Sequence, residues 1–227
     1  MKLAAAIKDI PMPKRVACLP RDARGFPVPW FVTWFLHGKR SAPGIGEPDF
    51  RIADTTRKFA AIRKGLCWIC GERLGKHLAF CIGPMCAINR VSSEPPAHLD
   101  CAIYSAKACP FLSKPAMRRN EKVLPNEWMA PAGHMIARNP GVALIWVTPS
   151  AVIETGHEGG TGLLYRLGDP SQLLWFAEGR PATRDEVFAS IESGLPSLQA
   201  LCDNDDDHKA LADHVAKAMP LINASLT

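Results

Sequence analysis

The strongest constraint on the fold is a dense run of soft ligands in the first half of the chain. Six of the eight cysteines and two of the seven histidines lie within residues 66–112. In a reducing compartment such a run is typical of metal ligands or buried thiols and not of disulfides. Cys67 and Cys70 flank two residues and are followed at once by Gly71, which is the arrangement of a zinc knuckle: the chain turns tightly, and the glycine lets the backbone bend beneath the metal.

A second pair of ligands, His98 and Cys101, follows after a gap of 27 residues. Prolines at positions 95 and 96 are expected to end any preceding helix and to begin a new one, because proline is favoured in a first turn. His98 and Cys101 then lie on one face of that turn, and the helix runs to Pro110. Residues 76–83, between the two pairs, have the apolar pattern of a strand. We therefore predict a zinc ion bound by four side chains, Cys67, Cys70, His98 and Cys101.

The order of knuckle, strand and ligand-bearing helix in residues 65–110 resembles the treble-clef class of zinc finger. An iron–sulfur cluster is an alternative, although the spacing matches neither ferredoxin pattern; its ligands would come from Cys67, Cys70, Cys86, Cys101 and Cys109. Cys81 and Cys109 are otherwise interpreted as buried thiols. Cys86 follows a turn and is interpreted as a buried thiol, an alternative ligand or an exposed thiol.

The remaining patterns predict an α+β fold, in which an N-terminal treble-clef-like zinc module is followed by a C-terminal half of a strand, a hairpin and helices. Five prolines between positions 11 and 29 predict an extended N-terminal arm. The other predicted elements are strands at 28–35 and 49–54, which are expected to pair with each other, and a strand at 141–148. A hairpin formed by 162–167 and 172–177 and helices at 55–64, 184–193, 195–202 and 208–219 complete the prediction.

Helix signals support two of these elements. Asp54 or Thr55 is expected to cap the helix at 55–64, and Gly65 to end it. The expected buried face of this helix comprises Phe59, Ile62 and Leu66. Thr183 and Glu186 have the spacing of a capping box, which places the start of a later helix at residue 184.

Charge divides the chain into two halves. Residues 1–122 contain 21 Lys and Arg against 9 Asp and Glu, a balance of +12, whereas residues 123–227 contain 6 against 13, a balance of −7. We predict a basic zinc-binding module with its arm at residues 1–125 and an acidic α/β half at 126–227, the two packing separately or as one domain. A basic half favours a polyanionic partner, but attraction between the halves explains the asymmetry equally well. The predicted phosphate contacts are Lys14, Arg15, Arg118, Arg119 and Lys122.

Several familiar functional motifs are absent from the sequence. Residues 157–162 are rich in glycine but lack the ending of a phosphate-binding loop, and residues 203–208 lack the glycine that a calcium loop requires. The N-terminal apolar run is five residues long, and no segment approaches the roughly 18 apolar residues of a membrane span. The sequence therefore predicts a cytoplasmic protein without a membrane segment.

The first half of the chain also resembles an uncharacterised group of small bacterial and phage-type proteins. The motifs that carry the resemblance are PVPWFV, PDFR, CWICGERLG, IGPMCAINR, SSEPPAHLDCA and ACPFL. The resemblance implies no reaction. The leading hypothesis is a zinc-stabilised binding protein that contacts nucleic acid or a complex acting on it. The alternatives are a metal- or thiol-dependent enzyme that uses Cys86, His134 or His157, and a protein–protein interaction module.

Overall fold

A four-stranded antiparallel sheet forms the centre of the protein in the computed structural model, which describes residues 5–114, 131–133, 140–157 and 162–226. The strand order is β10-β9-β6-β4, with bounds β4 Leu78–Ile82, β6 Ala143–Thr148, β9 Gln172–Ala177 and β10 Arg180–Pro181. Every residue of β6 is buried, as expected for a continuous apolar run in a central strand. Since β4 pairs with β6, segments from the two halves of the chain share one sheet.

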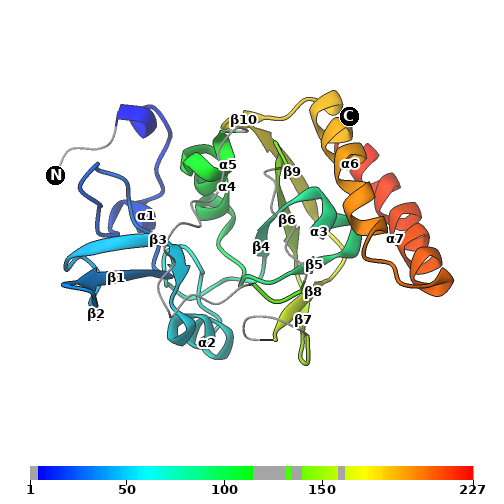
Figure 1. Ribbon diagram of the computed structural model, residues 1–227. Helices are drawn as coiled ribbons and strands as arrows, with labels where there is room; N and C mark the ends of the chain where they lie inside the picture. The colour runs from blue at the N-terminus through cyan, green and yellow to red at the C-terminus, as the bar shows by residue number, and fades with distance from the viewer. Residues whose placement is uncertain (1–4, 115–130, 134–139, 158–161, 227) are drawn as a thin grey trace.

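Helices cover both faces of this sheet (Figure 1). Side chains at alternate positions of a strand point to opposite faces. Phe80 and Trp146 pack in the core beneath α3 Pro84–Asn89, α6 Arg184–Gln199 and α7 Asp205–Ala224. Ala79 and Ile145 pack in the core beneath α4 Leu99–Ala108, which is followed by α5 Pro110–Ser113. The predicted metal ligands lie on the α4 side.

The predicted hairpin of residues 162–167 with 172–177 is wrong. The first strand, β8 Leu164–Leu167, joins a second sheet of order β5-β8-β7 with β5 Val91–Ser92 and β7 Ala151–Glu154, while β9 joins the central sheet. The connecting residues bond to β6 instead of closing a hairpin. Trp146 Nε1 donates to the carbonyl oxygen of Gly168 at 3.1 Å, and Thr148 Oγ1 donates to that of Asp169 at 2.9 Å. These bonds direct the chain from one sheet to the other.

The N-terminal region is more regular than predicted. Residues 11–29 do not form an extended arm: α1 Lys14–Ala17 is a short helix, preceded by the 3-10 turn η1 Ala5–Ile7. Val16 is almost completely buried in the core beneath α4, and this burial explains why the segment packs against the domain. The strands β1 Val32–Leu36, β2 Lys39–Ser41 and β3 Glu47–Ala53 form a third antiparallel sheet. The predicted pairing of the first and last of these is confirmed, and β2 was missed.

Helix α2 Thr55–Lys64 has the predicted ends but only part of the predicted buried face, since Ile62 packs half-buried against the core and Phe59 does not. Asp54 accepts a hydrogen bond from the Arg57 N–H, and Gly65 adopts the left-handed conformation that ends the helix. Ala61 is the fully buried residue, whereas Phe59 is 45% exposed. The helix presents an aromatic ring to solvent where the periodicity predicted a core residue.

The C-terminal half ends in two helices, α6 and α7. The capping box of Thr183 and Glu186 is present at the start of α6. The break predicted between residues 193 and 195 is absent, because α6 continues to Gln199 with Pro196 inside it. Helix α7 is longer than predicted. The described fold is a mixed α+β structure with three antiparallel sheets, in agreement with the predicted class. Among the described helices, none has the length and apolar character needed to cross a membrane.

Candidate metal centre

Four side chains converge at the edge of the α4 core. The sulfur atoms of Cys67, Cys70 and Cys101 and a ring nitrogen of His98 all lie within 4.8 Å of one another. A tetrahedron with metal–sulfur bonds of about 2.3 Å has edges of about 3.8 Å, so these four atoms fit the first shell of a single ion. Cys67 and Cys101 are completely buried, and the cluster therefore forms part of the packed interior.

The first two ligands are held by a tight turn. The Gly71 N–H donates to the carbonyl oxygen of Cys67 at 2.8 Å, and the Cys67 N–H donates to that of Glu72 at 2.7 Å. Gly71 has a φ of +77°, and a Cβ at this position would lie 2.7 Å from the ring of Trp30. Both the conformation and the close approach require glycine here. The Cys70 N–H points at the sulfur of Cys67, at 3.5 Å, as in a metal-binding knuckle.

The second pair is positioned by an extended segment tied to the central sheet. Ala97 and Ala79 exchange two backbone hydrogen bonds, of 2.8 and 3.0 Å. This places His98 at the N-cap of α4 and Cys101 in its first turn. The helix was predicted to begin at the prolines of positions 95 and 96; both are instead buried in the extended segment, and the helix begins at Leu99. The predicted proximity of His98 and Cys101 holds because the N-cap and the first turn lie together.

The imidazole of His98 is oriented by a backbone carbonyl. Its Nε2 lies 3.0 Å from the carbonyl oxygen of Arg73, and this contact is a hydrogen bond only if Nε2 carries the proton. The other nitrogen, Nδ1, lies 3.4 Å from the sulfur of Cys70 and keeps its lone pair for a metal. Ligand histidines commonly have such a partner, which sets the tautomer and the ring orientation.

The three neighbouring sulfur atoms can all be thiolates only if a cation compensates their charge. Hydrogen bonds from the thiols of Cys101 and Cys70 hold the pKa of Cys67 far below its ordinary value. Because the Cys101 thiol donates to the sulfur of Cys67, its own pKa is raised far above the ordinary value. Three sulfurs this close cannot all carry a negative charge without a compensating ion. A divalent cation between them would allow all three to be thiolates.

Arg15 lies beside the cluster. Its guanidinium is 3.5 Å from a carboxylate oxygen of Asp100 and 3.8 Å from one of Glu72. Partial burial lowers the pKa of Arg15, but Asp100 and the neighbouring cysteines raise it to a net value above its ordinary one. Arg15 therefore links α1 to the knuckle and to the first turn of α4. Lys14, the other predicted phosphate contact of this segment, is exposed on α1.

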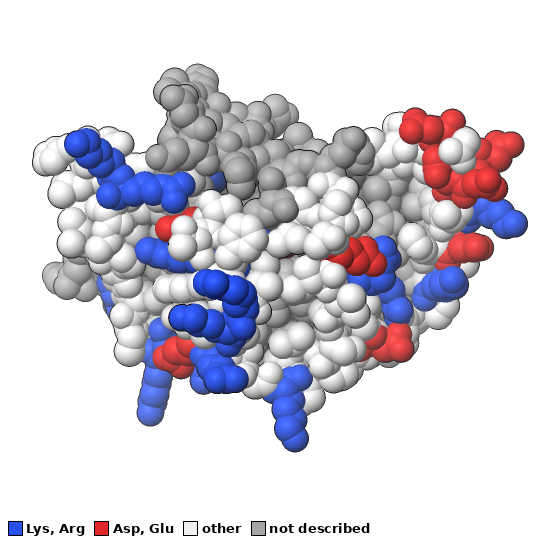
Figure 2. Space-filling model, turned by 90° about the horizontal axis from the view of Figure 1, so that it is seen from below, with Lys and Arg blue, Asp and Glu red and all other residues white. Residues whose placement is uncertain are grey.

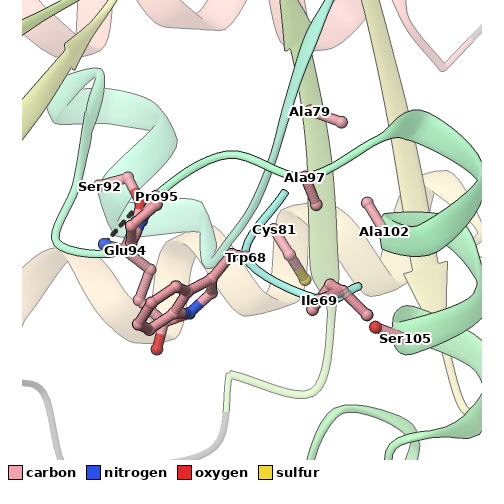
Figure 3. A pocket seen from close by; sticks show the side chains of 10 residues that line it. All are labelled: Trp68, Ile69, Ala79, Cys81, Ser92, Glu94, Pro95, Ala97, Ala102 and Ser105. Atoms are coloured by element: carbon pink, nitrogen blue, oxygen red, sulfur yellow. Dashed lines mark hydrogen bonds between the residues drawn. The ribbon is translucent and has the colours of Figure 1, made fainter. Parts of the chain in front are cut away.

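The other cysteines of the run lie outside the cluster. Cys86 is on α3 and packs with the opposite core, and burial raises the pKa of its thiol. Burial also raises the pKa of Cys109, and that of Cys81 to about 12. Figure 3 shows Cys81 in the wall of a cavity between β4 and α4. That cavity, of about 30 Å³, is too small for an organic substrate, since ligand pockets in proteins are typically about 300–1,000 Å³.

Of the remaining predicted site residues, the structure describes only His157. The Nε2 of His157 lies 3.5 Å from the carboxylate of Glu154, on the β7 side of the molecule. Four others lie outside the described residues: Arg118, Arg119, Lys122 and His134. No protein family, curated protein or solved structure matches this chain.

Sequence reasoning missed the role of Arg73, which orients His98, and the ion pairs that Arg15 makes beside the cluster. Arg73 acts through its backbone carbonyl, so its residue type carries no signal of the role. Arg15 was predicted to contact phosphate. Its ion pairs were not foreseen, because the sequence of a basic segment does not reveal which acids will pack against it. The only available signal was a pair of acids one or two residues from candidate ligands in the sequence, Glu72 and Asp100.

Proposed function

We propose that this protein is a zinc-stabilised protein that binds nucleic acid. The observation that carries the zinc assignment is the group of three cysteine sulfurs and one histidine nitrogen within 4.8 Å. Zinc favours this ligand set, and in structural sites four protein ligands complete its coordination. An iron–sulfur cluster would place several inorganic atoms between its thiolates, which the close approach of these four ligand atoms disfavours.

The buried cluster has the character of a structural site. Four protein ligands leave no position open for a substrate, whereas catalytic zinc normally keeps one. The knuckle and the ligand-bearing helix support the treble-clef assignment for residues 65–110, with β4 between them. The partner of β4 is β6, from the second half of the chain, so this zinc module would be built into the central sheet.

The nucleic-acid part of the proposal rests on charge. The first 122 residues carry a balance of +12, and a metal-fixed scaffold would hold cations in place before a polyanion arrives. Lys14, Arg15, Arg118, Arg119 and Lys122 remain the predicted phosphate contacts. Arg15 is the weakest of these, because its charge is already matched by Glu72 and Asp100.

A direct test measures metal content and binding together. The purified protein is expected to contain one zinc per chain by elemental analysis and no iron or sulfide. It should shift labelled oligonucleotides at low salt, with an affinity that falls steeply as salt rises. Replacing Arg118, Arg119 and Lys122 by alanine should reduce the slope of log K against log salt by up to about 3 without loss of zinc.

Two outcomes would contradict the proposal. Stoichiometric iron and sulfide would exclude the zinc assignment. If neither DNA nor RNA shifts at micromolar protein in low salt, the nucleic-acid assignment fails. A triple variant that loses stability but not affinity would show that these three cations pair with the acidic half.

A further inference from the structure

An open groove runs between the end of α2 and the knuckle. Its volume is about 730 Å³, within the range of functional ligand sites. The cations along it are Arg63, Lys64 and Arg73, and the apolar residues along it are Leu66, Leu74 and Leu78. The three leucines are half-buried and the three cations are exposed. The groove thus combines an apolar lining with positive charge.

The two walls of the groove are fixed to each other and to the metal centre. Leu66 and Arg73 form an antiparallel bridge, and the Leu74 N–H donates to the carbonyl oxygen of Gly65 at 2.8 Å. The carbonyl of Arg73 also holds Nε2 of His98. The backbone of Arg73 is therefore in contact with a candidate metal ligand, and this contact connects one wall of the groove to the metal centre.

The cations of the groove are not matched by acids. None of the three has an ion-pair partner among the residues that the structure describes. Several other arginines are paired with acids, as Arg166 is with Glu154 and Arg180 with Glu186. Figure 2 shows Lys and Arg gathered on the α2 side of this face, whereas acidic side chains gather on the α6–α7 side. Unmatched, exposed charge in one groove indicates an anionic ligand.

We infer that this groove binds single-stranded nucleic acid, with phosphates on Arg63, Lys64 and Arg73 and bases against the leucines. The inference rests on the proposed function and assigns it a site. A duplex presents mainly phosphates to a protein surface and would leave the apolar lining unused, whereas a single strand offers both phosphates and base faces. Phe59, one helical turn before Arg63 on the same face of α2, exposes 45% of its surface and can stack on a further base.

The test compares two triple variants with matched loss of charge. The groove variant is Arg63→Ala, Lys64→Ala and Arg73→Ala. The control is Lys39→Ala, Lys209→Ala and Lys217→Ala, which removes three exposed lysines from β2 and α7. Affinity for a fluorescein-labelled 20-mer of deoxythymidine is measured by anisotropy between 0.05 and 0.3 M salt. Zinc content and the thermal midpoint are measured in parallel, because Arg63 and Lys64 also lie in the last turn of α2, where cations stabilise a helix.

The groove variant is expected to retain zinc. Its slope of log K against log salt should fall by about 2, since each phosphate contact to a single strand contributes about 0.7. This change corresponds to a loss of roughly 100-fold in affinity at 0.1 M salt. The control should bind like the unmodified protein. Phe59→Ala should weaken binding roughly 5- to 100-fold with no change in slope, the effect of losing one stacked base.

Equal affinity of the two triple variants would overturn the groove assignment while leaving the proposed function intact. Tighter binding of a 20-base-pair duplex, lost in the groove variant, would overturn the single-strand assignment. If the unmodified protein binds neither probe, the proposed function itself fails, and the groove assignment fails with it.

Discussion

The cysteines of this protein differ in the groups that surround their sulfur atoms. The sulfur of Cys67 faces the backbone N–H groups of Cys70 and His98, at 3.5 and 3.4 Å, an arrangement that stabilises negative charge on sulfur. Cys81 and Cys86 lie in surroundings that favour the neutral thiol. The two environments separate ligand cysteines from packing cysteines, and each leads to a measurable difference.

Cys70→Ser should abolish stoichiometric metal binding, whereas Cys81→Ser should not. A serine hydroxyl is not ionised at neutral pH and is a poor zinc ligand, so the first variant leaves three ligands at a four-ligand site. Elemental analysis after gel filtration would measure the zinc that remains. Equal zinc in the two variants would show that Cys70 is not a ligand.

Alkylation of the native protein at pH 7.5 should label Cys18 first and leave Cys81 and Cys86 unlabelled until the protein unfolds. Cys18 is an exposed thiol. Alkylation requires the thiolate, and a pKa raised to about 12 leaves roughly one Cys81 in ten thousand or fewer ionised at this pH. Peptide mass spectrometry after timed iodoacetamide treatment would give the order. Rapid labelling of Cys86 would instead favour the enzyme hypothesis.

The convergence of the four candidate ligands could be predicted because spacing alone carries their signal. Two close pairs of soft ligands, one followed by glycine and one at a helix start, specify a site whatever lies between them. The residues that orient the site could not be predicted. Arg73 contributes a carbonyl, which every residue has, and Arg15 finds its acids through tertiary packing. Sequence patterns report residue types, and these contacts depend on positions in space.

At the scale of elements, the local signals were confirmed, whereas the predicted hairpin of β8 with β9 was wrong. The caps of α2 and α6 were predicted from two or three adjacent residues and are present as predicted. The strands β8 and β9 were also placed correctly, but their pairing was wrong because the intervening turn bonds to β6. A short connection with turn residues favours a hairpin, and only the tertiary contacts of Gly168 and Asp169 decide otherwise.

Thr183→Ala should destabilise the protein by about 1 kcal/mol, because it removes the side-chain acceptor of the α6 capping box. Urea unfolding at pH 7 in the presence of zinc would measure the difference. Thr183→Ser keeps the hydroxyl and is the matched control, with an expected loss below about 0.5 kcal/mol. If the two variants lost equal free energy of unfolding, the effect would not come from the hydroxyl group of the cap.

The carboxyl group of Glu186 should remain ionised at pH values well below the ordinary pKa of a glutamate. The Arg180 guanidinium and the Thr183 N–H hold its pKa at about 2, compared with an ordinary value of about 4.3. Because the folded-state pKa is the lower one, its stabilising contribution is complete above about pH 4.3 and is lost as pH falls through 2. The carboxyl carbon chemical shift should therefore stay constant from pH 7 to pH 4. A titration midpoint near 4.3 would show that the ion pair does not persist in solution.

On the scale of the whole molecule, the central sheet joins two cores that lie on its opposite faces. Ile145 and Val147 of β6 face the core that contains Cys67 and Cys101, while Leu144 and Trp146 face α6 and α7. Neither core can be removed without exposing one face of the same sheet. The candidate metal centre is thereby coupled to the acidic half of the chain, although its four candidate ligands lie in the basic half.

Removing the metal should therefore unfold more than the knuckle. Zinc bound at 1,000 times its dissociation constant stabilises a fold by about 4 kcal/mol, and a chain of this size shifts its midpoint by about 2–4 °C per kcal/mol. A strong chelator under reducing conditions should lower the thermal midpoint by at least about 8 °C or abolish the cooperative transition, and zinc, but not magnesium, should restore it. Tryptophan fluorescence reports the knuckle and the opposite core together, since Trp68 lies within the knuckle and Trp146 beneath the C-terminal helices. An unchanged midpoint in protein shown by elemental analysis to be free of metal would contradict a structural role for the cluster.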